Sequence, residues 1–152
     1  MRKIRVYVDT SVFGGTQDEE FAEASQRFFR RVQRGEFTVL LSAHTVDELM
    51  PAPDQVLDVL RDLPKHCVEE IAASEEAEAL AEAYIGAGAL GEAAHMDALH
   101  VAAATVAGAD LIVSWNFKHI VQVGKIRRFI SVNLMHGYQA IDIRSPREVV
   151  SL

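Results

Sequence analysis

The stretch IRVYVDTSVF at residues 4–13 places β-branched and aromatic side chains immediately before an acid and two hydroxyl side chains. This pattern predicts a buried strand over residues 4–8 that ends in a turn at Asp9. Apolar runs of the same kind occupy residues 37–41, 111–114 and 141–143. The sequence therefore predicts several short buried strands spread along the chain.

Segments with apolar residues at helical spacing separate these strands. The expected helices cover residues 18–34, a short stretch that Ser42 caps, and residues 53–63, 74–85 and 94–107, and residues 67–71 form a further candidate strand. Strands that alternate with helices are typical of a parallel sheet covered on both faces. We therefore expect a single domain over residues 1–152 with a three-layer α/β/α fold around a central parallel sheet.

The composition of the 152 residues argues against several classes of protein. A net charge of −7 disfavours broad coating of nucleic acid, although the balance turns positive from Phe117 onward. Cys67 is the only cysteine, so the chain can form neither an internal disulfide nor a thiolate zinc site. No apolar run reaches the roughly 18 residues of a membrane span, and the first residues do not resemble a signal peptide. We expect a cytoplasmic protein that does not enter a membrane.

Four residues with oxygen-bearing side chains adjoin the apolar segments: Asp9, Glu48, Asp97 and Asn116. In a parallel sheet the ligand site lies beyond the carboxyl ends of the strands, where we expect these side chains to meet. Buried carboxylates are costly unless a cation or a metal ion compensates them, and few basic residues lie next to them in the sequence. Because oxygen ligands favour hard divalent ions, the four residues indicate a site for Mg²⁺ or Mn²⁺.

Each of these residues also has a purely structural explanation. Asp9 could cap the turn after the strand, and Glu48 could complete a Thr-x-x-Glu capping box with Thr45. Asp97 could face solvent on its helix, and Asn116 could be an ordinary turn residue. It is their joint occurrence that favours a shared site.

Four segments carry these residues in order: VYVDTSVF at 6–13, VDEL at 46–49, DALHVAAA at 97–104 and ADLIVSWN at 109–116. Together they resemble the PIN domain family, and the similarity spans nearly the whole chain. PIN domains have an α/β/α fold with a central parallel sheet. Many are metal-dependent endoribonucleases, among them the VapC-type toxins of toxin–antitoxin pairs. The resemblance implies an RNA substrate, a homodimer and a small antitoxin protein as partner.

The resemblance also assigns roles to the four residues. Asp9, Glu48 and Asp97 match three acids of the family and would bind Mg²⁺ or Mn²⁺ directly or through water. Asn116 stands where many members have a fourth acid. A neutral amide there still offers a carbonyl oxygen, but the missing charge should weaken a second metal position.

Smaller polar residues surround these positions in the sequence. Thr10 and Ser11 could orient a water molecule or a phosphate, or could simply satisfy the turn. Ser114 could donate a hydrogen bond to the carboxylate that ends the first strand. Lys118 and His119 are well placed to touch an RNA phosphate, or could simply be exposed charges at the start of a helix. His95 and His100 lie five residues apart and point in different directions on a helix, so we expect His100 to pack in the core.

These observations leave three functional hypotheses. The first is hydrolysis of RNA phosphodiester bonds by a metal-activated water, with Glu48 acting as a ligand or a base. The second is a catalytically weakened module that binds RNA or a protein partner without cleavage. The third is cleavage of DNA by the same ions, since the sequence does not disclose whether the protein reads the 2′-hydroxyl.

Overall fold

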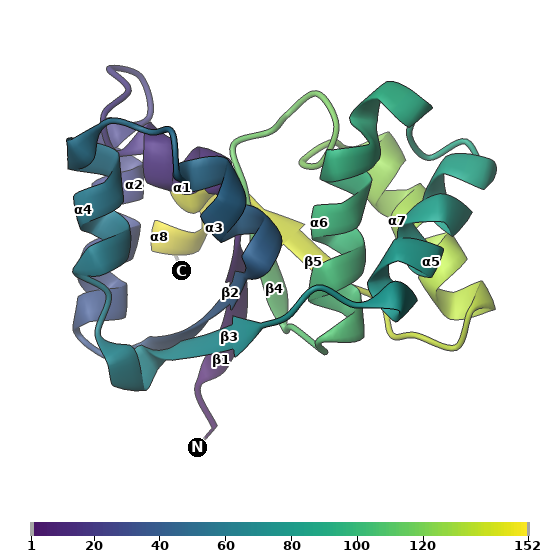
Figure 1. Ribbon diagram of the computed structural model, residues 1–152, viewed down its shortest axis with the longest axis horizontal. Coiled ribbons are helices and arrows are strands. Elements are labelled where there is room, and N and C mark those ends of the chain that lie inside the picture. Colours follow the sequence, from purple (N-terminus) through teal and green to yellow (C-terminus); the bar gives the residue numbers. More distant parts are fainter. Residues whose placement is uncertain (1, 152) are drawn as a thin grey trace.

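The structure is a computed structural model that describes residues 2–151. Five strands form one sheet in the order β3-β2-β1-β4-β5, and every neighbouring pair is parallel. The strands are β1 (Ile4–Val8), β2 (Phe37–Ser42), β3 (Val68–Ile71), β4 (Leu111–Val113) and β5 (Asp142–Arg144). The predicted central parallel sheet with flanking helices is confirmed (Figure 1).

Helices pack on both faces of the sheet, as Figure 1 shows. Helices α5 (Glu75–Gly86), α6 (His95–Val106) and α7 (Val123–Met135) cover one face, and α2 (Ala22–Gln33), α4 (Asp54–Arg61) and α8 (Pro146–Val150) cover the other. Two short helices, α1 (Thr10–Gly15) and α3 (Ala43–Leu49), follow β1 and β2 directly, and the short 3₁₀ helices η1 (Lys65–Cys67) and η2 (Glu92–Ala94) precede β3 and α6.

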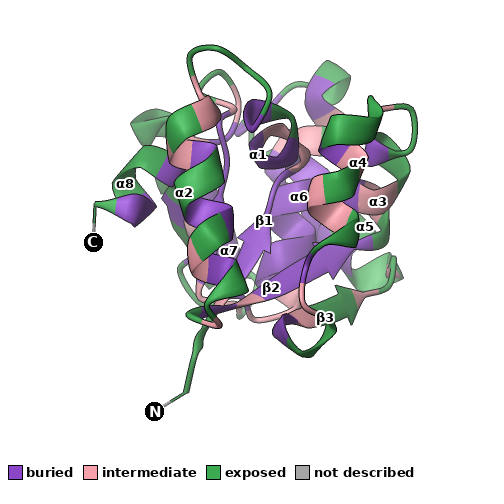
Figure 2. Ribbon diagram, turned by 90° about the vertical axis from the view of Figure 1, so that its left-hand side faces the viewer, coloured by how far each residue is buried: buried purple, intermediate pink, exposed green. Residues whose placement is uncertain are grey.

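The alternation of side chains along each strand divides the core into two clusters. Tyr7, Leu40 and Ile112 face the α5–α7 layer, whereas Val8 and Val39 face the α2–α4 layer. Both sets are almost completely buried, and Figure 2 shows β1 and β2 as mostly buried between the helices, whereas the edge strand β3 is not. Burial on both faces explains why the three central strands have nearly continuous apolar runs.

The long helix expected over residues 18–34 begins later, at Ala22. The carboxylate of Asp18 accepts hydrogen bonds from the backbone N–H groups of Glu20 and Phe21, at 2.8 and 3.3 Å. These bonds form a local turn that competes with the helix, which is a common use of aspartate. The acids expected in the first helical turn therefore lie mostly in the preceding loop.

Other predicted boundaries differ by small amounts. The last strand covers Asp142–Arg144 in place of residues 141–143, and the strand at 67–71 begins at Val68. Helix α1 replaces the turn expected after Asp9, and α7 is a helix of 13 residues for which the sequence pattern indicated no bounds. Within residues 2–151 we find no helix with both the length and the apolar character needed to cross a membrane.

The Ser74 cap provides a test of the local structure. Its Oγ accepts a hydrogen bond from the N–H of Ala77 at 3.1 Å, at the start of α5. Ser74→Ala should lower the free energy of unfolding by about 1 kcal/mol, because that N–H loses its partner. Ser131→Ala on the exposed side of α7 is the control, with an expected change below about 0.5 kcal/mol. Denaturant unfolding measures both, and equal values would contradict the capping role.

Candidate functional site

The candidate residues gather at the carboxyl ends of the three central strands. Asp9 follows β1 directly, Ser114 follows β4, and α3, which carries Glu48, starts where β2 ends. Helix α6 brings His100 to the same edge of the sheet, since His100 Nε2 lies 3.7 Å from Asp9 Oδ1. Asp97 precedes His100 on α6 and is close enough for its charge to act on that ring. This is the edge at which parallel sheets bind ligands.

Asp9 is 5% exposed and is held by two serine hydroxyls. Ser11 Oγ and Ser114 Oγ both donate to its Oδ2 atom, at 2.7 and 2.8 Å. The hydrogen bond expected from Ser114 is therefore present. Asp9 occupies the N-cap position of α1, but its side chain accepts no capping hydrogen bond. The two serines thus fix the orientation of the carboxylate and leave Oδ1 on the other side.

Glu48 bridges α1 and α6. Thr10 Oγ1 donates to Glu48 Oε1 at 2.8 Å, and His100 Nε2 forms a hydrogen bond to the same oxygen. The alternative of a capping box with Thr45 is wrong, because Ser42 is the N-cap of α3 and its Oγ accepts the Thr45 N–H. Glu48 therefore belongs to the group of residues at the sheet edge.

His100 is the main functional candidate that the sequence analysis did not assign to the site. Its predicted burial is confirmed at 1% exposure, but both ring nitrogens have polar partners. Nδ1 lies 2.6 Å from the hydroxyl of Tyr7, which in turn lies 2.8 Å from Ser42 Oγ. A buried polar chain therefore runs from β2 through Tyr7 and His100 to Glu48.

The pKa shifts of His100 and Glu48 both favour an ion pair between them. Burial alone would lower the pKa of His100, but the hydrogen bond to Glu48 and the charges of Asp9, Glu48 and Asp97 outweigh it and raise that pKa. Burial alone would raise the pKa of Glu48, but His100 and the Thr10 hydroxyl outweigh it and lower that pKa. Both directions favour a protonated imidazole beside an ionised carboxylate.

Asp97 and Asn116 are connected through His119. His119 Nδ1 lies 2.7 Å from Asp97 Oδ2, and the Asn116 carboxamide oxygen accepts the backbone N–H of His119 at 2.9 Å. Asp97 lies in the first turn of α6, closer to the helix start than expected. Asn116 shapes the turn after β4, in agreement with its structural explanation. Its carboxamide oxygen, which the sequence offered as a metal ligand, accepts a hydrogen bond in that turn.

The expectation that the acids lack cationic partners is wrong for Glu48, which pairs with His100. Asp97 forms a hydrogen bond with the ring of His119. Neither histidine is adjacent to its acid in the sequence, so inspection of chain neighbours could not find it. Asp9 lies near His100 but accepts its hydrogen bonds only from neutral hydroxyls. The acids are thus partly compensated by the protein itself.

The carboxylate oxygens that stay free determine whether the site suits a divalent cation. Asp9 Oδ1, Glu48 Oε2 and Asp97 Oδ1 receive no hydrogen bond from residues 2–151. In the same range, no group of three or more His, Cys, Asp or Glu side chains is arranged to hold one metal ion. Mg²⁺ commonly keeps several waters and takes one or two carboxylates together with substrate phosphates. The residues fit such a hydrated ion, and they do not fit a closed cage of protein ligands.

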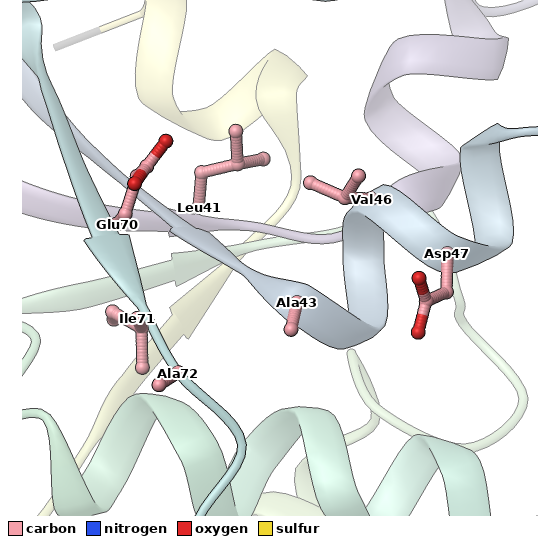
Figure 3. A pocket seen from close by; sticks show the side chains of 7 residues that line it. All are labelled: Leu41, Ala43, Val46, Asp47, Glu70, Ile71 and Ala72. Atoms are coloured by element: carbon pink, nitrogen blue, oxygen red, sulfur yellow. The ribbon is translucent and has the colours of Figure 1, made fainter.

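Two pockets lie near α3. One, of about 360 Å³, is lined by Thr10 and Glu48 and continues toward Pro53 and Val56 on α4. The other, of about 430 Å³, lies between α3 and the edge strand β3, where Figure 3 shows Asp47 and Glu70 at its rim. Only the first pocket contains residues of the candidate site.

Comparison with known proteins adds no assignment to this geometry. No protein-family model matches the chain, and no curated protein matches it. What the structure shows is an α/β protein with a five-stranded parallel sheet flanked by helices.

Proposed function

We propose that this protein is a divalent-metal-dependent endoribonuclease that hydrolyses RNA phosphodiester bonds, with a PIN-like active site. The observation that carries the proposal is the position of Asp9, Glu48 and Asp97 at one sheet edge. Each acid accepts side-chain hydrogen bonds at a single oxygen, and its other oxygen receives none from residues 2–151. The order of these acids in the PIN-like segments supports the same function.

The protein's own residues would prepare the site for this reaction. Ser11 and Ser114 orient Asp9, and His100 keeps Glu48 ionised and turned toward Asp9. A bound Mg²⁺ or Mn²⁺ would supply Lewis-acid activation of the phosphodiester and of the attacking water. Lys118 is exposed on the loop after β4, where its charge would attract the phosphate backbone.

A second candidate function is a module that binds RNA or a protein partner without cleaving it. Two observations favour it: the amide at Asn116, and the lack of a ready three-ligand metal group within residues 2–151. Calorimetric titration with Mn²⁺ separates the two candidates. A micromolar or tighter site that Asp9→Asn removes supports the enzyme, whereas no binding of Mn²⁺ supports the module.

The direct test is cleavage of matched oligonucleotides. We expect the purified protein to cut single-stranded RNA in Mg²⁺ or Mn²⁺ and to lose that activity in a chelator, because the ion compensates the charge that develops on the phosphate. A DNA oligonucleotide of the same sequence tests whether the 2′-hydroxyl is read. Cleavage that persists in the chelator, or no cleavage with either ion, would refute the proposal.

The resemblance extends the proposal to the toxin of a VapC-type pair, which acts as a homodimer and is bound by an antitoxin. The pocket beside Thr10 and Glu48 supports this extension, because a protein segment placed there would lie against the site. Its lining toward α4 includes the half-buried Ala52 and the exposed Pro53, which are suited to apolar contact.

A further inference from the structure

The loop after β4 carries Phe117, which is the one aromatic residue in the described chain with a largely exposed side chain, at 46%. Its ring packs against Trp115 and Phe21, with ring centroids 6.0 and 6.4 Å away. Those two rings stack on each other at 4.2 Å, and Arg147 lies over the Trp115 ring at 5.4 Å. Phe117 is therefore supported from beneath while part of its ring faces solvent.

The residues at the two ends of this loop, Ser114 and His119, contact candidate catalytic acids. Ser114 Oγ donates to Asp9 at 2.8 Å, and His119 Nδ1 lies 2.7 Å from Asp97. Phe117 follows Ser114 by three residues and precedes His119 by two. At 3.8 Å per residue, its Cα lies within about 11 Å and about 8 Å of theirs. The ring is thus close enough to meet a nucleotide next to one held at the acids.

Asn116 fixes the direction of the loop. Its side chain accepts the N–H of His119, and its backbone oxygen accepts those of Ile120 and Val121, at 3.0 and 2.8 Å. This turn buries Ile120 completely and leaves Phe117 and Lys118 together on the outside. An aromatic ring and a cation side by side match the two parts of a nucleotide, its base and its phosphate.

We infer that Phe117 is the stacking platform for one base of single-stranded RNA, with Lys118 beside the adjoining phosphate. The inference rests on the proposed function and names a substrate subsite for it. Every base has a π face, so stacking of this kind tolerates any sequence but requires an unpaired base. The acidic Asp18 and Glu20 precede Phe21 in the neighbouring loop, so the RNA backbone passes on the Lys118 side of the ring.

An apolar segment of a protein partner is the rival occupant. Such a segment needs a contiguous apolar surface, and the chain neighbours of Phe117 are the polar residues Asn116 and Lys118. Lys118 also makes no ion pair with any residue between 2 and 151, so its charge is available to a phosphate. These features favour a nucleotide.

The test measures binding separately from cleavage. A labelled single-stranded RNA, and copies in which one nucleotide at a time is abasic, are titrated with the protein in a chelator and followed by fluorescence anisotropy. Phe117→Leu keeps an apolar side chain without a π face, and Phe117→Tyr keeps the ring. Met135→Ala, at an exposed apolar residue of α7, is the matched control.

We expect Phe117→Leu to weaken binding by about 5- to 150-fold, equivalent to about 1–3 kcal/mol at tenfold per 1.4 kcal/mol. Phe117→Tyr and Met135→Ala should bind like the unaltered protein. At one position, removal of the base should weaken RNA binding by the unaltered protein but should not change RNA binding by Phe117→Leu. This non-additivity is expected when the missing base and the Phe117 ring are in contact.

Three results would overturn the inference: unchanged binding by Phe117→Leu, a loss of affinity that no abasic position reproduces, or no RNA binding by the unaltered protein. The cleavage assay described above separates this failure from failure of the proposed function. If Phe117→Leu cleaves RNA with unaltered kinetics, only the proposed base subsite is refuted. If the unaltered protein cleaves no RNA, the proposed ribonuclease function is refuted.

Discussion

The Asp9→Asn variant is expected to lose RNA cleavage by about a thousandfold or more, since loss of a charge that holds a catalytic cation costs several kcal/mol. Ser11 and Ser114 donate to Oδ2, so the new amide will turn its oxygen toward them. Its NH₂ group then takes the place of Oδ1, where it repels a cation. The substitution therefore reverses the electrostatics of the site at one atom and keeps both hydroxyl contacts.

The fold should tolerate this change, so Asp9→Asn should still unfold cooperatively, with a modest loss of stability because Oδ1 also lies 3.7 Å from the buried His100 ring. Asp142→Asn is the control, because Asp142 is an exposed carboxylate on β5 that pairs with Arg144 at 2.9 Å. Initial rates on single-stranded RNA should fall for the first variant and stay unchanged for the second. Full activity in a folded Asp9→Asn protein would rule out the assigned role of this acid.

The sheet and the location of the site followed from local patterns in the sequence. A run of apolar residues predicts a buried strand, and β1 has the expected bounds, Ile4–Val8. Because parallel strands end at one edge, acids that follow such runs must lie near one another. That reasoning placed Asp9 and Ser114 side by side, and their hydrogen bond at 2.8 Å confirms it.

The polar partners of the acids could not be predicted in the same way. His100 lies 52 residues from Glu48 and 93 from Tyr7 in the chain, so only the packing of α6 against the sheet brings them together. Spacing along one helix predicted only that His95 and His100 point in different directions, and their separate partners, Glu78 and Glu48, confirm this. That spacing gave no information on contacts with other elements. Tyr7 likewise read as an apolar strand residue, and its hydroxyl acquires a role only in the folded core.

Replacing His100 tests how far Glu48 depends on this buried partner. His100→Gln should lower the free energy of unfolding by about 1–3 kcal/mol, because hydrogen bonds within the core are lost. The side chain of Glu48 is 35% exposed, so the carboxylate can turn to water and the cost stays below that of stranding a buried charge. RNA cleavage should fall by about 10- to 100-fold, as is usual when an orienting partner is removed. His136→Gln, at an exposed position after α7, is the control.

The pH dependence of this stability difference identifies the ion pair. The pKa of His100 is raised above its ordinary 6.5, so its contribution is complete below that pH and is lost as the pH rises through the folded pKa. The pKa of Glu48 is lowered below its ordinary 4.5, so its contribution is complete above that pH and is lost as the pH falls through the folded pKa.

Denaturant unfolding in a chelator should therefore show the largest gap between His100→Gln and the unaltered protein near about pH 5.5, and the gap should shrink as the pH rises through the folded pKa of His100. A gap that does not change with pH would mean that His100 is neutral in the folded protein and acts only through its hydrogen bonds. In that case Glu48 would have to be held ionised by the Thr10 hydroxyl and by solvent, and the buried chain through Tyr7 would contribute packing without charge.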